Sequence, residues 1–454
     1  MILRISEARK RGMPPIRLIA LSFAIIIVVG ALLLTLPIAS KDGNFTHPLD
    51  ALFTSTSATC VTGLVLFDTF TKWTWFGQGV ILMLIQLGGL GLVSFTSFFA
   101  FTVRRRAGIK ELQLANEYIS NGNLADVPQL FRLICIVTLA FETVGAVLLG
   151  IRFVPKYGLQ GIWISIFLSV SAYCNAGFDI LGMEGPFSNL THYNDDPLVI
   201  LTVSFLIIFG GLGFVVINDI VFMRKHGHIL LHTRIVLLCT AILIVVGTVG
   251  ILSIEYNNPD TLGPMPLGEK LSASFFQSVS ARTAGFNSID LGSMREPCKM
   301  LMCALMFIGA APGSTGGGIK VTTFVVLMMT VYSVMRGRDD TVVLHRRVDK
   351  KVVYKALSIT ILSGALTIFT FFVVFYCQRN LGVSAIDSLV ESTSAFGTVG
   401  LSCGVTPDLA VGSKIAVIFT MFCGRVGPIS LALAISARSK RSDAILPEGR
   451  IMVG

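Results

Sequence analysis

Charged residues are scarce in this sequence: they make up 14% of its 454 residues, whereas an ordinary soluble domain carries about 25%. Hydrophobic residues make up 53%. Too few charged side chains remain to cover a water-facing surface, so the composition excludes a soluble fold. The chain is therefore predicted to be an integral membrane protein in contact with lipid.

Patterns for metal, nucleotide and disulfide chemistry are also lacking. The nine cysteines are scattered, mostly within or beside apolar runs, and no Cys-x-x-Cys spacing occurs. No nucleotide-binding pattern is present, and no cluster of histidine, cysteine or acidic residues lies within the apolar runs. A metal at His226, His228 and His232 stays open, although a solvated basic loop is the better interpretation.

Long apolar runs take the place of the missing charge. A helix needs about 20 residues to cross a bilayer core of about 30 Å. The first run follows a basic segment and precedes no small-residue cleavage site, so it is interpreted as a retained span rather than a signal peptide. The eight long runs cover residues 17–38, 75–102, 130–151, 198–222, 234–254, 298–335, 353–377 and 412–435.

The basic excess, a net charge of +10, is concentrated on one side of the predicted topology. Eight spans place both termini on the same side, and the segments on that side hold 24 of the 36 lysine and arginine residues. This asymmetry is the positive-inside signature, which places both termini in the cytoplasm. Membrane orientation explains the positive charge, so no nucleic-acid partner is expected.

One short pattern occurs four times along the chain. The copies are DALFTSTSATCVTGL from Asp50, IFLSVSAYCNAGF from Ile166, SFFQSVSARTAGF from Ser274 and DSLVESTSAFGTVGL from Asp387. The final glycines of successive copies are 114, 108 and 115 residues apart, which indicates fourfold duplication. The expected units are repeat 1 at 1–126, repeat 2 at 127–232, repeat 3 at 233–350, repeat 4 at 351–436 and a cytoplasmic tail at 437–454.

Each copy ends a short half-apolar run that lies between two long ones. These short runs, of roughly 12–15 residues, cannot cross a membrane but suit a re-entrant helix. Irregular backbone survives at membrane depth only where protein buries it or a watery cavity adjoins it. The predicted fold is therefore all-α: four span–pore-loop–span repeats with pseudo-fourfold symmetry around one central pore, built from eight transmembrane helices and four re-entrant pore helices.

The pore loops suit a cation. A re-entrant helix that enters from outside points its carbonyl end, with its partial negative charge, toward the membrane centre. Glycine then permits the positive φ with which a following segment can turn its carbonyl oxygens inward, and such oxygens replace the hydration shell of potassium. The predicted filter residues are Val61, Thr62, Gly63, Asn175, Ala176, Gly177, Thr283, Ala284, Gly285, Thr398, Val399 and Gly400.

Acidic residues flank these loops. One acid follows each filter glycine, and it either concentrates cations at the mouth or is an ordinary loop acid or helix cap. Two further acids, Asp50 and Asp387, are predicted to be N-caps of pore helices, because each lies thirteen residues before its glycine. The acids that follow the glycines are Asp68, Asp179, Asp290 and Asp408.

These residues resemble the Trk/Ktr/HKT superfamily of potassium transporters, and most closely its Ktr-type potassium-translocating subunits, over nearly the whole chain. The segments TCVTG, CNAG, RTAG and GTVG resemble that family's pattern of one glycine per loop. Only the fourth, which ends at Gly400, resembles the longer signature of tetrameric potassium channels. In the family, serine at the first filter glycine is associated with sodium permeation, so Gly63 implies potassium.

A gate is expected within the sixth apolar run. Its 38 residues exceed one straight span, and proline and several glycines interrupt it at residues 308–320. The interruption resembles the family's intramembrane gate loop; close helix packing is the alternative. The predicted gate residues are Gly309, Ala310, Ala311, Pro312, Gly313, Ser314, Thr315, Gly316, Gly317, Gly318, Lys320 and Arg425.

Arg425 belongs to that set because a charge at membrane depth is rare and by default functional. Beneath a cation filter it either sets a barrier or contacts the gate loop, and the resemblance places a gating arginine here. The glycine clusters at residues 88–91 and 210–213 are interpreted as packing positions, and Glu142 as a buried charge with a structural partner.

The resemblance also implies partners. Ktr-type subunits form homodimers, each protomer with its own pore, on a KtrA-like cytosolic ring of regulatory subunits that bind ATP, ADP or NAD-type nucleotides. Such systems are typically sodium-dependent and lie in the bacterial plasma (inner) membrane. The chain itself is expected to hold no cofactor besides the transported potassium, with sodium as a second candidate. Residues 336–355 and the tail are candidate surfaces for the ring and the dimer.

Two rival functions predict other patterns. A secondary transporter for another cation or a small solute predicts inverted repeats and paired ionisable residues at the midplane. Here the repeats are parallel, and Arg282 is the sole charged residue of the filter segments. A membrane-embedded enzyme needs clustered catalytic residues within the spans, and none occurs. The chain is therefore not expected to be an enzyme.

Overall fold

The computed structural model describes residues 15–102, 127–226 and 229–427. Several features of the sequence lie outside these ranges: most of the N-terminal basic segment, the basic segment at 104–110, His228, the end of the eighth run at 428–435 and the tail at 437–454. The side predicted to face outward is called the outer side below.

The described part of every predicted span is helical, and three of the spans are interrupted within the described ranges. In the described ranges three helices are long and apolar enough to cross a membrane unbroken: Arg132–Tyr157, Leu231–Glu255 and Lys350–Cys377. Each begins a repeat, and Pro197–Leu212 with Phe214–Val221 adds a span bent by 93°. The span helices are α2 (Pro15–Thr35), α5 (Trp75–Thr102), α7 (Val127–Tyr157), α9 (Pro197–Leu212) with α10 (Phe214–His226), α11 (Leu231–Glu255), α13 (Glu296–Phe307) with α14 (Val321–Met335), α15 (Lys350–Cys377) and α17 (Val411–Val426).

The interruptions fall in the second spans of the first three repeats. The sequence predicted one, at residues 308–320, and the structure has it between α13 and α14. Two others occur at glycines with positive φ, Gly91 (64°) and Gly213 (87°), and in the fourth repeat α17 ends before Gly427, which also has positive φ (90°). The interpretation of the first two clusters as packing positions alone was therefore incomplete, since a left-handed glycine ends regular helix geometry.

Packing is nevertheless confirmed one turn earlier. A Cβ at Gly88 would lie 2.0 Å from the Thr59 carbonyl oxygen, and one at Gly210 would lie 2.0 Å from that of Tyr173. Both carbonyls lie at the last turn of the pore helix of the same repeat. Any side chain at these glycines would push the second span away from the pore helix.

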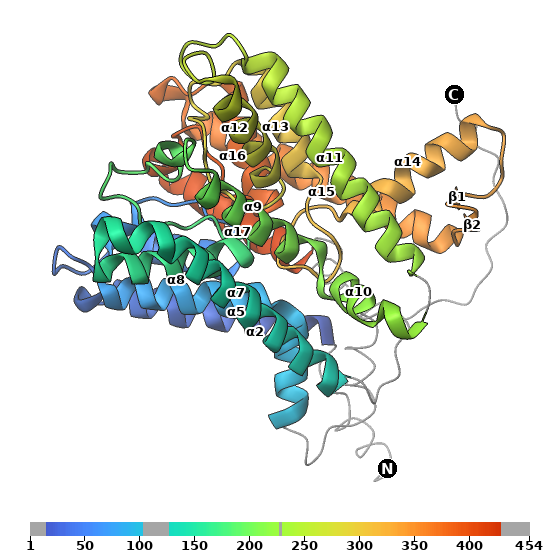
Figure 1. The fold of residues 1–454 in the computed structure, drawn as a ribbon, viewed down its shortest axis with the longest axis horizontal. Coiled ribbons are helices and arrows are strands. Elements are labelled where there is room, and N and C mark those ends of the chain that lie inside the picture. Colours follow the sequence, from blue (N-terminus) through green and yellow to red (C-terminus); the bar gives the residue numbers. More distant parts are fainter. Residues whose placement is uncertain (1–14, 103–126, 227–228, 428–454) are drawn as a thin grey trace, which may run out of the picture.

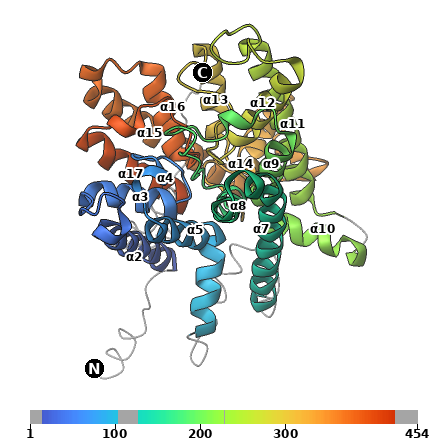
Figure 2. The ribbon, with the colours of Figure 1, turned by 60° about the vertical axis from the view of Figure 1, so that its left-hand side comes forward.

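Four short helices enter the bundle between the spans, as predicted. Each packs against the first span of its own repeat and against the second span of the preceding repeat, and the contact of α17 with α3 closes the ring. Figure 2 shows α2, α3, α15, α16 and α17 gathered on one side of the molecule, so helices of the first and fourth repeats lie side by side there. The pore helices are α3 (Pro48–Thr59), α8 (Leu159–Tyr173), α12 (Leu267–Ser280) and α16 (Ala385–Gly397).

A serine and a glycine hold three of these pore helices to their first spans. Ser55 Oγ donates to the Ile27 carbonyl at 2.7 Å, and a Cβ at Gly30 would lie 2.5 Å from Ser55 Oγ. Ser169 with Gly145 and Ser278 with Gly247 repeat the arrangement. The missing side chain lets the serine reach the backbone of the span.

The two predicted N-caps are wrong. His47 and Ser384 are the N-cap residues of α3 and α16, and each acid lies in the first turn instead. There Asp50 pairs with Lys414 of α17 at 2.7 Å, and Asp387 pairs with Lys299 of α13 at 2.8 Å. The acids therefore tie a pore helix to the second span of the preceding repeat.

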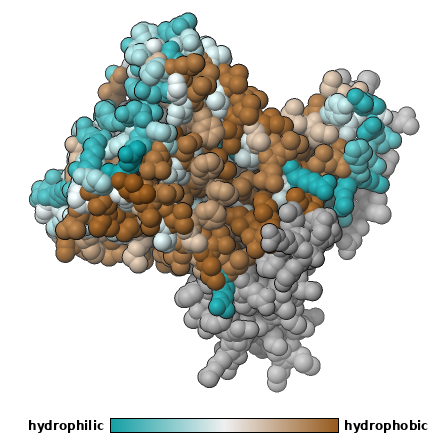
Figure 3. Space-filling view, viewed as in Figure 1, coloured by the Kyte–Doolittle hydropathy of each residue, from teal (hydrophilic) through white to brown (hydrophobic). Residues whose placement is uncertain are grey.

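The remaining elements are short. Strand β1 (Val342–Val343) pairs antiparallel with β2 (Arg346–Arg347), with Val342 opposite Arg347, and Figure 1 shows this hairpin carried away from the bundle at the end of α14. Figure 3 shows hydrophobic residues across the middle of the visible face and hydrophilic residues at two ends, as a membrane span requires. The other elements are α4 (Thr69–Lys72), η1 (Pro37–Ala39), η3 (Thr191–Tyr193), η4 (Arg379–Leu381) and η5 (Thr406–Asp408).

Candidate functional site

The four predicted filter segments share one backbone conformation. All four glycines have positive φ, from 70° to 97°. The residue two positions earlier also has positive φ in every repeat: Val61 (57°), Asn175 (58°), Thr283 (78°) and Thr398 (49°). Left-handed backbone is uncommon for residues other than glycine and is concentrated at functional sites. Its recurrence at four equivalent positions points to one shared task.

The structure brings the four glycines together in a closed ring. A Cβ at Gly63 would lie 2.5 Å from the Ala176 carbonyl oxygen of the next repeat. The corresponding distance from an added Cβ to the carbonyl oxygen of the next repeat is 2.8 Å for Gly177 and Ala284, 2.2 Å for Gly285 and Val399, and 2.2 Å for Gly400 and Thr62. Each filter glycine therefore abuts the carbonyl of its neighbour, and a side chain at any of the four would occupy that place.

A serine of each pore helix holds the filter, and sequence reasoning missed it. Ser57 Oγ accepts from the Gly63 amide at 3.1 Å, and Ser394 Oγ accepts from the Gly400 amide at 3.0 Å. In the other repeats Ser171 donates to the Phe178 carbonyl at 2.6 Å and Ser280 donates to that of Phe286. The signal was present, because Ser-Ala occurs in all four copies of the pattern, five or six residues before the glycine.

A cavity of about 270 Å³ opens on the outer side of the ring and is lined by all four glycines. Three of the four predicted mouth acids line it, Asp68, Asp179 and Asp290, whereas Asp408 does not. Asp68 also accepts from the Thr71 amide at 2.7 Å and caps α4. The helix-cap interpretation is therefore confirmed for Asp68, which also lines the cavity, whereas its role in concentrating cations stays a prediction.

Glu391 is a further buried acid that the sequence did not single out. It lies on α16, fully buried, and accepts hydrogen bonds from Ser402 Oγ at 2.8 Å and from Thr406 Oγ1 at 2.5 Å. Both hydroxyls belong to the segment that follows Gly400. The carboxylate thus ties the outer end of the fourth filter segment to its own pore helix.

Replacing Glu391 by alanine is expected to loosen the fourth filter segment and to lower the preference for potassium over sodium. Two hydroxyl donors would lose their acceptor, at a cost of about 1–3 kcal/mol for each unsatisfied group. Glu391→Gln keeps an acceptor oxygen at the same place and should retain most of the preference. Competition of sodium with rubidium uptake measures this, and an alanine variant with wild-type selectivity would show that the tie is dispensable.

The predicted gate residues between Gly309 and Lys320 form one compact loop in the sixth run. Gly309 N–H donates to the Ile319 carbonyl at 2.9 Å, which closes the loop at its base. The loop docks into the break of the second repeat: Ala311 N–H donates to Gly211 O at 3.1 Å, and Phe214 N–H donates to Gly313 O at 3.0 Å. The bend at Gly213 thus exposes backbone groups that receive the loop.

The loop lies directly against the filter segments. A Cβ at Gly316 would lie 2.1 Å from Thr283 Oγ1, and one at Gly317 would lie 2.1 Å from Thr398 Oγ1. Lys320 Nζ donates to the carbonyls of these same two glycines, at 2.7 and 3.3 Å. Close packing, the alternative interpretation of the glycines, is therefore observed, and the packing is against the filter segments.

Arg425 is in direct contact with the loop. Its Nη1 donates to the Thr315 carbonyl and its Nη2 to the Gly88 carbonyl. One guanidinium thereby joins three repeats: its own, the third through the loop and the first through α5. Glu142, on α7, accepts from Gln86 Nε2 at 3.2 Å, which supplies the structural partner expected for it.

Four pore loops that converge on a ring of glycines and carbonyls, with an irregular loop of the sixth run packed against it, define a multi-pass membrane protein of the pore-loop cation-transport class. The chain belongs to the TrkH family of cation transport proteins: residues 16–444 match the family described as "TrkH: Cation transport protein". Proteins of this family are transporters rather than enzymes.

Three curated relatives match the chain over nearly its full length. The Ktr system potassium uptake protein B of Bacillus subtilis (strain 168) is 38% identical and covers 98% of this chain and 97% of its own. The protein of the same name from Vibrio alginolyticus is 38% identical, with 99% and 96% covered. The potassium/sodium uptake protein NtpJ of Enterococcus hirae is 36% identical, with 99% of both covered.

One solved structure shows the same fold. The crystal structure of the potassium transporter TrkH from Vibrio parahaemolyticus superposes with a TM-score of 0.71 at 16% identity and covers 93% of this chain and 85% of its own. The fold of four pore-loop repeats around a central pore is thereby confirmed.

Proposed function

We propose that this chain is the potassium-translocating subunit of a multisubunit potassium-uptake system, with the four filter segments as its ion-selective site. The ring in which each filter glycine abuts the carbonyl of the next repeat carries this proposal. Carbonyl oxygens at such a ring replace the water around a dehydrated cation. The names of the relatives, which are potassium uptake proteins, support potassium as that cation.

The intramembrane loop at residues 308–320 is the proposed gate, with Arg425 as its latch. Gly316 and Gly317 lie against two filter threonines, so an ion that leaves the filter meets the loop next. Opening requires the loop to leave its docking place at Gly211 and Gly213. The contacts of Arg425 with two carbonyls hold the closed position.

Control is proposed to come from other subunits. The relatives named Ktr system proteins imply a system of more than one component. We assign this chain a homodimer on a cytosolic ring of nucleotide-binding subunits, in a bacterial plasma membrane with both termini cytoplasmic. Sodium dependence is proposed as well, and the name of the Enterococcus hirae relative includes sodium.

Uptake of potassium by cells that lack their own potassium importers tests the proposal. The chain should restore growth at low potassium when it is produced with its cytosolic partner, and rubidium should compete better than sodium. Omission of sodium from the medium tests the sodium dependence separately. Absence of uptake with and without the partner, for a chain shown to reach the membrane, would contradict the function.

A further inference from the structure

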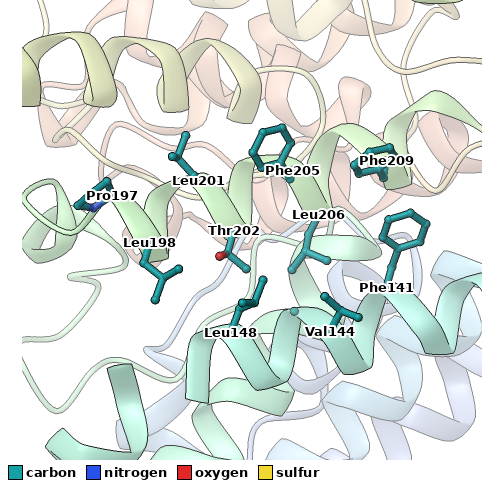
Figure 4. Close-up of a pocket in the computed structure, with 11 residues that line it drawn as sticks. Phe141, Val144, Leu148, Pro197, Leu198, Leu201, Thr202, Phe205, Leu206 and Phe209 are labelled. Atoms are coloured by element: carbon teal, nitrogen blue, oxygen red, sulfur yellow. The ribbon is translucent and has the colours of Figure 1, made fainter. Parts of the chain in front are cut away.

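An apolar groove of about 560 Å³ lies between α7 and α9, on the side of the second repeat away from the filter. Figure 4 shows its aliphatic and aromatic walls, where Thr202 is the one polar side chain among the residues drawn. Val144 and Phe205, on opposite walls, are 58% and 53% exposed. In a membrane protein this surface faces acyl chains, so the groove opens toward lipid.

The groove has a floor, unlike an open helix surface. A Cβ at Gly145 would lie 2.6 Å from Leu206 Cδ1, so α9 reaches the backbone of α7 there. On either side of this contact the larger side chains stand apart. The result is a slot between two helices rather than a flat apolar patch.

A charged pair marks the outer end of the groove. Val144, Leu148 and Arg152 follow each other at four-residue intervals on α7 and therefore share one face. Arg152 Nε pairs with Asp196 Oδ2 at 2.9 Å, yet 52% of the Arg152 side chain stays exposed. Asp196 is the N-cap of α9, directly before Pro197, which lines the groove.

The neighbouring cation is already engaged. Lys156, one turn further along α7, pairs with Glu184. Burial tends to raise the pKa of Glu184, but hydrogen bonds from Lys156, Tyr157 and Tyr193 outweigh it and hold that pKa below its ordinary value. Glu184 therefore stays ionised and keeps Lys156. Arg152 is also paired and equally exposed, but it lies one turn nearer the groove, next to Leu148 on the same face, so it is the cation that an anionic group at the groove would meet first.

The inner end of the groove is lined by aromatic residues that pack beside the carbonyls to which the gate loop is hydrogen-bonded. Phe209 stacks on Phe141 with ring centroids 4.8 Å apart, and Phe141 stacks on Tyr173 at 5.7 Å. The Tyr173 carbonyl accepts from Thr315 Oγ1 at 3.3 Å, and Gly210, next to Phe209, accepts from the Thr315 amide at 3.3 Å. A molecule bound in the groove would therefore contact Phe209 of α9, directly beside the Gly210 carbonyl that binds the loop.

We propose that the groove binds one membrane phospholipid, with an acyl chain in the slot and the phosphate at Arg152, and that this lipid braces α9 where the gate loop docks. An apolar slot that ends in an exposed guanidinium at the membrane surface matches the order of groups in a phospholipid. The bracing rests on the proposed function of the loop, whereas the binding does not.

Retention of phospholipid by the purified, delipidated chain tests the binding. After addition of phosphatidylglycerol, native mass spectrometry should show one more retained lipid for wild type than for Val144→Trp, which fills the slot. The matched control is Val147→Trp, since Val147 is 61% exposed on the same helix but does not line the groove. Diacylglycerol with the same acyl chains should not be retained, and Arg152→Gln should weaken retention of phosphatidylglycerol.

Equal retention by wild type and Val144→Trp would overturn the binding. So would a shift of Val144→Trp from dimer to monomer without loss of lipid, because the groove would then be an interface between copies of the chain. Potassium flux in proteoliposomes tests the bracing: Val144→Trp should change it relative to Val147→Trp. Unchanged flux with lost lipid overturns the bracing alone, and a wild type without flux refutes the proposed function while the lipid count remains readable.

Discussion

Gly285→Ala is expected to reduce potassium uptake by at least about tenfold, even where the protein reaches the membrane in normal amounts. Its Cβ would lie 2.2 Å from the Val399 carbonyl oxygen, a backbone atom that cannot move without deforming the fourth filter segment. The φ of +80° adds a strain of about 1–2 kcal/mol for any L residue. About 1.4 kcal/mol suffices for a factor of ten in rate. Rubidium uptake at fixed protein level measures the effect.

The third pore helix supplies the control. Gly268 is exposed on α12, and a Cβ there meets nothing within 4 Å, so Gly268→Ala should transport as wild type does. The clearances also predict a ranking: Gly177, at 2.8 Å, should tolerate alanine better than Gly285 or Gly400, both at 2.2 Å. At Gly63, serine should additionally weaken the preference for potassium over sodium. Wild-type uptake by Gly285→Ala would refute the filter assignment.

The pore helices and the filter glycines could be predicted because each repeat states them in the same local pattern. A short run that ends in one glycine occurs four times, and agreement among copies removes the ambiguity of any single copy. The closure of the ring could not be predicted in the same way. It depends on contacts such as that of Gly400 with Thr62, more than 330 residues apart in the sequence.

The breaks at Gly91 and Gly213 were missed for a different reason. A glycine inside a long apolar run is compatible with close helix packing and with a left-handed break of the helix, and the sequence of the run does not distinguish the two. The tertiary contact decides: Gly213 lies where the carbonyl of Gly313 receives the Phe214 amide. The third repeat was predictable because proline and many glycines exclude a continuous helix there.

The misplaced N-caps illustrate the limit of local signals. An acid near a helix start is favourable both as the cap and within the first turn. Pro48 begins α3 at its first position, which moves Asp50 into the turn. Asp50 then reaches Lys414, a partner 364 residues away that no local pattern contains.

Arg425→Ala is expected to raise potassium flux through the purified chain by about tenfold or more in proteoliposomes without a cytosolic partner. The substitution removes two charge-assisted hydrogen bonds, to the carbonyls of Thr315 and Gly88. Each such bond contributes about 1.5–3 kcal/mol, and the loss of about 1.4 kcal/mol of closed-state preference increases the open population tenfold. Potassium efflux measured with a potassium-sensitive dye reports the change.

Two further variants separate the latch from a purely electrostatic barrier. Arg425→Lys keeps the charge but offers a point donor in place of the two-armed guanidinium, so it cannot hold both carbonyls in the same way. A latch predicts that Arg425→Lys leaks, whereas a charge barrier predicts that it behaves as wild type. Lys320→Met removes the contacts with Gly316 and Gly317 but leaves Arg425 in place. It should therefore loosen the loop without abolishing closure, and lower flux in Arg425→Ala would show that the arginine supports the open pore instead.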